Sequence, residues 1–126
     1  MNVLSQIFAG VTAVALLGVG VLEIFFHGDR RFHSLFLIEP EDVRSVRMWA
    51  MNIGAYNITF ALGIIAGLWL VNLADQTAGV AIVLFCCAAQ VLLGIWLWIT
   101  ERRLLLSAIG QASLPAIALV CYFYLR

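Results

Sequence analysis

Hydrophobic residues fill four long stretches of this chain, and charged residues are almost confined to the segments between them. Each stretch is long enough to cross about 30 Å of hydrocarbon as a helix of roughly 20 residues. Membrane β-strands are shorter, at about ten residues, and alternate in polarity, so they do not account for stretches that are apolar throughout. The pattern therefore predicts four membrane-spanning helices, at residues 3–26, 48–73, 77–99 and 104–125.

The segments between these spans are short, and the longest covers residues 27–47. They leave no room for a separate soluble domain, so residues 1–126 are expected to form a single transmembrane domain. The end of the long segment has the features of a helix start, because Pro40 suits a first-turn position and Glu41 and Asp42 complement the positive end of the helix dipole. The expected fold class is an all-α membrane protein, built as a compact bundle of four transmembrane helices.

Composition strengthens this interpretation. Of the 126 residues, 64% are hydrophobic and 11% are charged, whereas a soluble domain is about half apolar and about a quarter charged. The lipid bilayer is thus the first expected partner of the chain. The formal net charge of zero and the lack of a basic groove give no indication of nucleic-acid binding.

The basic residues predict how the bundle is oriented. All seven are arginines, and six of them fall in the segments that follow the first and third spans. These six are Arg30, Arg31, Arg44, Arg47, Arg102 and Arg103, and the seventh, on the opposite side, is Arg126. By the positive-inside rule, both of those segments lie in the cytoplasm and both termini lie on the outer side. A bacterial cytoplasmic (inner) membrane is the expected location.

The residues do not indicate metal or thiol chemistry. Cys86, Cys87 and Cys121 lie within predicted spans and lack CxxC spacing, so they are expected to be packing residues. No acidic pair suits Mg²⁺ bound to a diphosphate, and both histidines lie in the loop, at positions 27 and 33. We therefore expect neither a metal nor a cofactor.

Glu23 is the only acidic residue inside a predicted span. An ionised carboxylate in hydrocarbon costs several kcal/mol, so this side chain must pair, reach water or stay protonated. His27 lies four residues further on and therefore on the same helix face. Two interpretations stay open: Glu23 is a functional acid, or it sits at the headgroup level and hydrogen-bonds to His27 or to a backbone group.

A second group of polar residues lies in the stretch MNIGAYN of the second span. Asn52 and Tyr56 are four residues apart and share a face, while Asn57 lies about 100° from Tyr56. At 1.5 Å per residue, one polar or amphipathic residue from each span falls within roughly 12 Å of the same membrane boundary: Glu23, Asn52, Trp96 and Gln111. Because polar side chains in membrane helices turn inward, we expect the stretch to face Glu23 across a polar pocket. The alternative is that these amides only join helices through hydrogen bonds, as is expected of Gln90.

Two further features concern helix shape and contact. Gly63-x-x-x-Gly67 in the second span forms a face on which helices approach closely. We favour packing within the bundle for this face, and the other interpretation is a seam between copies in a homo-oligomer. Pro115 in the fourth span removes a backbone donor and is expected to bend that helix.

Four stretches, LEIFF, RRF, AMNIGAYNITFALGIIAG and GQASLPAIAL, follow a recognisable pattern. Together they resemble, over nearly the whole chain, a small bacterial four-span membrane family catalogued only as a domain of unknown function. That family has Leu-Glu before the aromatic end of the first span, Ala-x-Asn-Gln-Gly-x-Tyr-Asn in the second and Gln-x-x-x-Pro-Ala in the fourth. The resemblance implies shared residues at Glu23, Asn52, Gly54, Tyr56, Asn57, Gln111 and Pro115.

Two departures from that pattern concern the expected cavity. Ile53 stands where the family has Gln, and His27 stands where Trp is expected. They imply a less polar cavity and a more hydrophobic ligand. The chain is also, more loosely, similar to the small integral-membrane terpene cyclases of bacterial indole-terpenoid pathways, which combine a few apolar helices with isolated membrane carboxylates.

The function expected from these residues is that of a membrane enzyme acting on a hydrophobic small molecule. Glu23 would serve as general acid toward an isoprenoid-type epoxide or alkene that enters from the lipid, and would start its cyclisation or isomerisation. The expected catalytic residues are Glu23, Tyr56 and Asn52, and the expected substrate-binding residues are Asn57, Gln111, Trp96, Phe25, Phe26 and His27. Two other classes stay open, a small proton-linked transporter and a structural or accessory subunit.

Overall fold

The computed structural model describes residues 1–125, and all regular structure within this range is helical. The elements are α1 (Val3–Phe25), η1 (Arg30–Phe32), α2 (His33–Phe36), α3 (Val43–Leu73), α4 (Gln76–Thr100), η2 (Arg102–Leu104) and α5 (Leu105–Tyr124). Four segments are long and apolar enough to cross a membrane, namely α1, α3, α4 and η2 together with α5. The predicted all-α bundle of four transmembrane helices is confirmed, and the chain is a multi-pass membrane protein.

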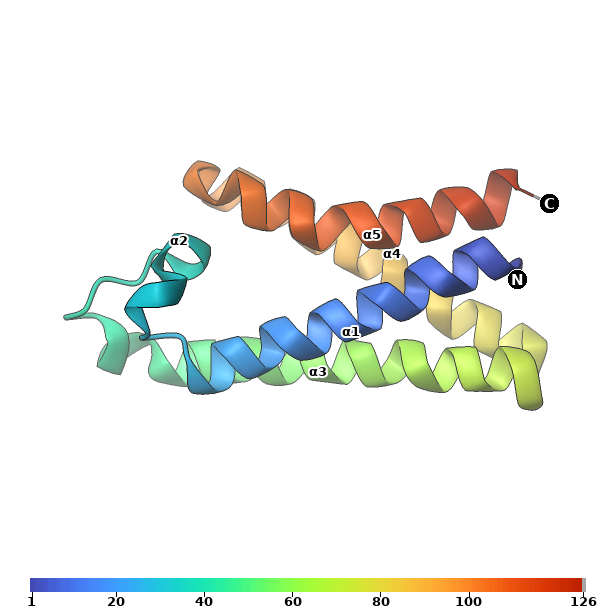
Figure 1. The fold of residues 1–126 in the computed structure, drawn as a ribbon, viewed down its shortest axis with the longest axis horizontal. Coiled ribbons are helices and arrows are strands. Elements are labelled where there is room, and N and C mark those ends of the chain that lie inside the picture. The colour runs from blue at the N-terminus through green and yellow to red at the C-terminus, as the bar shows by residue number, and fades with distance from the viewer. Residues whose placement is uncertain (126) are drawn as a thin grey trace.

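Toward the loop end of the bundle the four long helices run as two pairs, α1 with α3 and α4 with α5 (Figure 1). α3 also packs against α4, and α1 against α5, so the helices follow the order α1, α3, α4, α5 around the bundle. The start of α1, the end of α5 and the α3–α4 turn lie together at one end of the bundle, the terminal end. η1, α2 and η2 lie at the opposite end, the loop end.

Hydrogen bonds close the terminal end. Asn2 Oδ1 caps α1 by accepting a hydrogen bond from Ser5 N (2.8 Å), and Asn2 Nδ2 donates to Cys121 O and to Leu125 O (2.6 Å each). Ser5 Oγ donates to Ala118 O (2.8 Å) at a buried position. Cys121 O also accepts a backbone bond from Leu125 N (3.2 Å), so the amide of Asn2 is a second donor to that carbonyl. The start of α1 therefore holds the end of α5.

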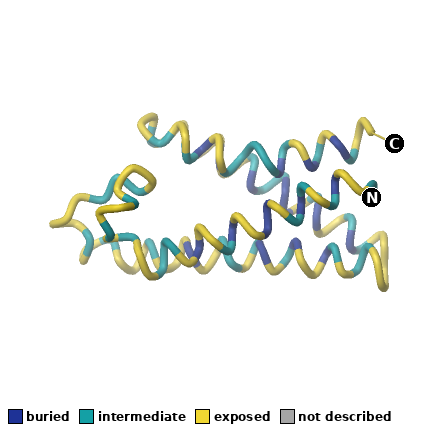
Figure 2. The backbone as a smooth tube through the Cα atoms, in the orientation of Figure 1, coloured by how far each residue is buried: buried dark blue, intermediate teal, exposed yellow. Residues whose placement is uncertain are grey.

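The buried apolar core lies in the terminal half and the middle of the bundle (Figure 2). Its members are mostly small and come from all four helices: Ala9, Ala13, Leu16, Ala61, Ile64, Val83, Cys86, Cys87 and Ala118. Gly67 lies in the same contact region, because a Cβ there would lie 2.7 Å from Val83 Cγ2, and one on Gly63 would lie 3.1 Å from Cys86 Sγ. The Gly63-x-x-x-Gly67 face therefore packs against α4 within the bundle.

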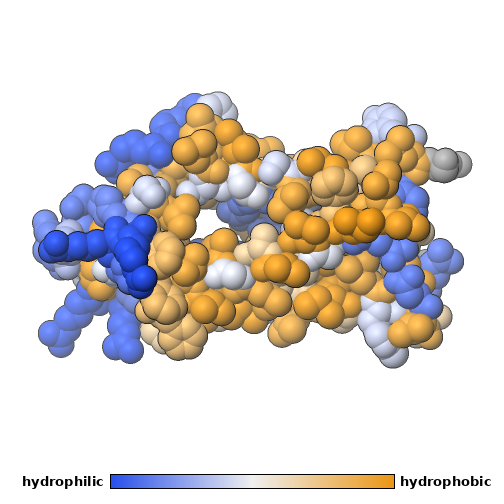
Figure 3. Space-filling view, in the orientation of Figure 1, coloured by the Kyte–Doolittle hydropathy of each residue, from blue (hydrophilic) through white to orange (hydrophobic). Residues whose placement is uncertain are grey.

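In the loop half, the described residues make close contacts within each helix pair but no shared core. A Cβ on Gly54 would lie 2.7 Å from Gly20 O, and a Cβ on Gly94 would lie 2.9 Å from Ala112 Cβ. The two pairs themselves separate, because α5 diverges from α1 and α3 toward the loop end (Figure 1). The space-filling view shows an opening between them, bordered mostly by apolar surface (Figure 3).

The segment between α1 and α3 bridges the loop end. η1 and α2 lie between the end of the α1–α3 pair and the start of α5 (Figure 1), and Ser107 Oγ donates to Leu35 O at 3.4 Å. α3 then begins at Val43, directly after Pro40, Glu41 and Asp42, where the sequence has the features of a helix start. The opening is thus bridged at its loop end and faces sideways, toward the lipid.

We predict that Gly54→Ala destabilises the bundle by about 1–3 kcal/mol, because the new methyl group would overlap a backbone oxygen of α1 that cannot rotate away. Gly18→Ala is the matched control, since a Cβ there meets nothing within 4 Å. The midpoint of thermal unfolding in detergent, followed by tryptophan fluorescence, should fall for the first variant only. Equal midpoints for the two variants would contradict a close α1–α3 crossing at this position.

Candidate functional site

The inward face of α1 turns polar toward the loop end. Its buried residues recur every three or four positions, and the same spacing continues from Gly20 to Glu23 and His27. Both of these polar side chains are half-buried. The helix thus carries its only carboxyl group on the face that packs against the bundle rather than on the lipid side.

The inward faces of the other three helices also become polar toward the loop end. Asn57 follows the buried Gly54 by three residues on α3, Gln90 follows the core residue Cys86 by four on α4, and Gln111 lies between the buried residues of α5. With Glu23, these residues form an inner polar set, one from each transmembrane helix: Glu23, Asn57, Gln90 and Gln111. Each of them continues an inward stripe beyond the apolar core toward the loop end.

Hydrogen bonds join the inner polar set two by two, within the helix pairs. Asn57 Nδ2 donates to Glu23 Oε2 (2.7 Å), which links α3 to α1. Gln111 Nε2 donates to Gln90 Oε1 (3.0 Å), which links α5 to α4. The contact of Gly63 with Cys86 sets the register of α3 against α4 and places Asn57 about two residues, or roughly 3 Å, nearer the loop end than Gln90. The two bonded pairs therefore lie at similar depth in the half of the bundle where the helix pairs separate.

Several polar atoms of this set are left available. Glu23 Oε1, Asn57 Oδ1 and Gln111 Oε1 take part in none of the hydrogen bonds between residues 1–125, and they are not fully enclosed. In the same part of the chain, two polar side-chain atoms are both fully enclosed and unpartnered, His27 Nε2 and Gln90 Nε2. The two amide oxygens can thus accept hydrogen bonds from a molecule that enters between the helix pairs, and the carboxyl oxygen can accept one or, when protonated, donate one.

Histidine 27 is held in one tautomer by α1. Its Nδ1 lies 3.0 Å from the backbone oxygen of Glu23, and a carbonyl oxygen only accepts hydrogen bonds. The proton of the neutral ring therefore sits on Nδ1, and Nε2 carries a lone pair. Glu23 and His27 are therefore in contact, as expected, but the hydrogen bond is to the backbone oxygen of Glu23 and not to its carboxylate.

The structure places four of the sequence-predicted site residues on the outer surface. Asn52 is exposed and its Nδ2 donates to Met48 O of its own helix (2.8 Å), while the side chain of Tyr56 is 64% exposed. Trp96 is 62% and Phe25 72% exposed, on surfaces that would meet lipid. Phe26 packs edge-on against Phe32, with ring centroids 6.1 Å apart.

The rotation of α3 explains which residues of MNIGAYN reach Glu23. Gly54 must face α1, because the helices approach there too closely for a side chain. Residues two positions away on either side, Asn52 and Tyr56, then point about 160° from it, whereas Asn57 at three positions returns to within about 60°. From the sequence, Gln90 is expected only to join helices through hydrogen bonds. Its spacing of four residues from Cys86 and from Gly94 is the signal that places it on the inward face of α4 with the other polar residues.

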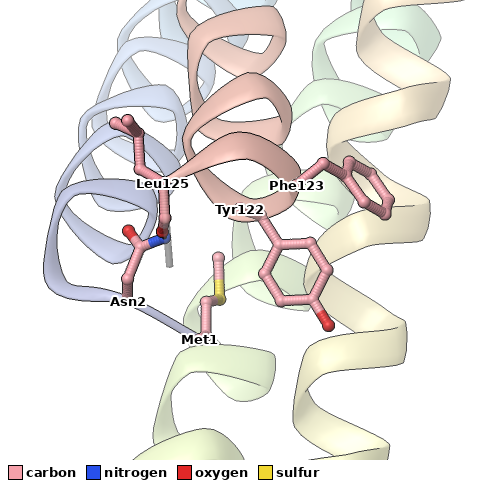
Figure 4. A pocket seen from close by; sticks show the side chains of 5 residues that line it. All are labelled: Met1, Asn2, Tyr122, Phe123 and Leu125. Atoms are coloured by element: carbon pink, nitrogen blue, oxygen red, sulfur yellow. The ribbon is translucent and has the colours of Figure 1, made fainter.

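Two hollows lie at the terminal end. One is lined by Met1, Asn2, Tyr122, Phe123 and Leu125 (Figure 4), and the other by Val3, Gln6, Ile7, Leu68 and Asn72. The amide of Asn2 already binds α5, and Gln6 Oε1 accepts a hydrogen bond from Asn72 Nδ2 (2.8 Å). Neither lining contains a carboxyl or imidazole group, so the candidate site is the one between the helix pairs.

Two carboxylates at the loop end are paired with arginines, unlike Glu23. Arg31 Nη2 lies 2.7 Å from Asp29 Oδ2, and Arg103 Nη2 lies 2.9 Å from Glu101 Oε2. These hydrogen bonds lower the pKa of Asp29 and that of Glu101 to about 2. Residues 1–125 contain no cluster of three or more His, Cys, Asp or Glu side chains that would hold a metal ion.

We predict that Glu23 and Asn57 are energetically coupled, whereas Glu23 and Asn52 are not. In a double-mutant cycle of Glu23→Ala with Asn57→Ala, the coupling should amount to about 0.6–2 kcal/mol, the range of hydrogen bonds between membrane helices. The cycle with Asn52→Ala should be additive within about 0.5 kcal/mol. The free energy of unfolding in mixed detergent and SDS micelles measures both, and coupling to Asn52 alone would contradict the site described above.

A family described as "Protein of unknown function (DUF1304)" matches residues 10–123, a range that includes the whole inner polar set. Comparisons with curated proteins and with solved structures gave no match. Because the family match covers nearly the whole chain, this four-helix membrane protein belongs to the DUF1304 family.

Proposed function

We propose that this protein is an integral-membrane enzyme in which Glu23 protonates a lipophilic, isoprenoid-type substrate and so starts its cyclisation or isomerisation. The observation that carries the proposal is the 2.7 Å hydrogen bond from Asn57 Nδ2 to Glu23 Oε2. It holds one carboxyl oxygen and leaves Oε1 without a partner among residues 1–125. A carboxyl group held in this way has one oxygen left for a substrate.

The chemistry requires the acid form of Glu23. In that form the amide of Asn57 donates to the carbonyl oxygen of the carboxyl group, and the hydroxyl on Oε1 donates its proton to an alkene carbon or an epoxide oxygen. Among residues 1–125, no cationic side chain is bonded to Glu23, in contrast to Asp29 and Glu101, and hydrocarbon disfavours an unpaired carboxylate. A positioned acid contributes about 10²–10⁴-fold to the rate.

Access from the lipid supports an apolar substrate. The opening between the helix pairs faces sideways and is bordered mostly by apolar surface (Figure 3). The oxygens of Asn57 and Gln111 that are free of hydrogen bonds would face positive charge that develops on the substrate. Tyr56, Trp96 and Phe25 are largely exposed on the outside, so we assign the stabilisation of charge to the amide oxygens instead of these rings.

The test uses purified protein, a panel of farnesyl- and geranylgeranyl-bearing aromatics and their terminal epoxides, and chromatography with mass detection. We expect a product of unchanged mass and altered retention, formed at least about 100-fold more slowly by Glu23→Gln. Asn52→Leu and Tyr56→Phe are the controls, because both side chains lie outside the site, and they should convert at the wild-type rate. The proposal is wrong if wild type converts none of these compounds or if Glu23→Gln converts them equally fast. The protein would then be interpreted as an accessory subunit or a transporter.

A second readout for the same prediction needs no substrate. Dicyclohexylcarbodiimide is apolar and reacts with protonated carboxyl groups, so it should add to the peptide that contains Glu23. Asp29 and Glu101 serve as internal controls, since ion pairing keeps them as carboxylates in water. Peptide mass spectrometry of the wild type and Glu23→Gln detects the adduct, and labelling of the loop carboxylates without Glu23 would contradict a protonated acid accessible from the lipid.

We also propose that the loop end faces the cytoplasm of a bacterial inner membrane. The support is the group of six arginines in the loop-end segments and the first turns of the adjacent helices. The seventh arginine, Arg126, lies outside the described residues.

Cysteine labelling tests this orientation, because the three native cysteines are buried and unbonded. A membrane-impermeant maleimide on intact cells should label Thr77→Cys, at the exposed start of α4, and should leave Ser34→Cys, in α2, unlabelled until the cells are permeabilised. The reverse pattern would show that the loop end faces outward.

A further inference from the structure

We propose that Trp98 and Arg102 form a binding site for the phosphate group of an anionic phospholipid at the loop end of the bundle. This inference does not depend on the proposed function of Glu23. It begins from a stacked pair, because Cζ of Arg102 lies 4.2 Å from the centroid of the Trp98 ring. The negative face of the indole attracts the guanidinium and holds it in one place at the end of α4.

Arg102 and its neighbour Arg103 use their charges differently. Arg103 donates to Glu101 through Nε (3.0 Å) and Nη2 (2.9 Å), so a carboxylate occupies the edge of its guanidinium. The side chain of Arg102 is exposed and takes part in no hydrogen bond or ion pair between residues 1–125. Stacking covers one face of this guanidinium and leaves its N–H donors at the edge. That edge fits a phosphate group, which guanidinium binds through two parallel hydrogen bonds.

The position of the pair favours a lipid over a soluble phosphate. Trp98 lies two residues before the end of α4, which is the level at which tryptophans of membrane proteins meet the lipid headgroups. Its side chain is 40% exposed, and Ile95, three residues nearer the middle of the span and on the same helix face, is 47% exposed. A phospholipid whose phosphate binds Arg102 can therefore place an acyl chain along this apolar face.

The local charges favour an anionic headgroup over a zwitterionic one. Glu101, the carboxylate next to Arg102 in the chain, is already paired with Arg103. Arg102 therefore presents a positive charge that no side chain bonded to it neutralises. A choline headgroup carries its own cation beside the phosphate, whereas the headgroup of phosphatidylglycerol does not. Basic residues next to the membrane attract anionic lipids by this interaction.

The test measures the binding of dioleoyl phosphatidylglycerol and of dioleoyl phosphatidylcholine to the purified protein by native mass spectrometry. We expect wild type to bind the first molecule of phosphatidylglycerol more tightly than phosphatidylcholine, and Arg102→Gln to weaken that binding about 5-fold. Trp98→Leu should weaken it about 2–5-fold with no change in net charge, because the guanidinium is no longer held. Trp98→Phe, which also stacks, should retain most of the affinity.

Arg103→Gln is the control for charge alone. It removes the same charge one residue away and also frees the carboxylate of Glu101, so a general attraction predicts a loss at least as large as that of Arg102→Gln. The proposed site predicts a smaller loss. Arg102→Lys keeps the charge without the planar fork and should also weaken binding, which keeps the test decisive where Trp98→Leu does not fold. Equal affinity of wild type for both lipids, an equal or greater loss in Arg103→Gln, or unchanged binding by Trp98→Leu and Arg102→Lys would overturn the proposal.

A competitor distinguishes a lipid site from a site for soluble phosphate esters. Glycerophosphoglycerol carries the same phosphate diester as phosphatidylglycerol but has no acyl chains. At millimolar concentration it should leave the lipid bound, because it gains nothing from the apolar face of α4. Displacement of phosphatidylglycerol under these conditions would overturn the assignment of the site to a lipid.

Discussion

The close crossing of α1 and α3 at Gly20 and Gly54 determines the rest of the candidate site. With no side chain between them, the two backbones approach until a Cβ on either glycine would lie 2.7 Å from the backbone oxygen of the other. The two helices run in opposite directions (Figure 1), so Glu23 and Asn57 lie on either side of this crossing, and their side chains meet across it in a 2.7 Å hydrogen bond. A wider crossing would leave an unpartnered carboxyl group in the membrane, which is costly.

The two ends of the bundle are built on different principles. At the terminal end, side chains at the start of α1 bind carbonyls near the end of α5, and small residues from all four helices fill the core. At the loop end, contacts are made within each helix pair, and the pairs separate around an opening (Figure 3). The terminal end thus holds all four helices together, and the loop end holds them only in pairs.

Electrostatics divides the acidic residues into two kinds. Asp29 and Glu101 lie in water beside arginines, and these partners lower their pKa values to about 2. Glu23 lies within a transmembrane helix and is bonded to an amide. The amide orients the carboxyl group without adding a charge, so the same side-chain type is ion-paired in the loops and only hydrogen-bonded in the membrane.

The sequence by itself determined the four spans, the membrane class and the singular position of Glu23, because the length of an apolar run and a charge within it are local properties of the chain. It did not determine which amides meet which helix. Asn57 and not Asn52 or Tyr56 reaches Glu23, and Gln111 reaches Gln90. Those outcomes depend on how each helix is rotated about its axis, and that rotation is decided by tertiary contacts, where Gly20, Gly54 and Gly94 allow neighbouring backbones to meet. Asn52 and Tyr56, two positions from Gly54, turn outward, whereas Asn57, three positions away, returns to the side of α1.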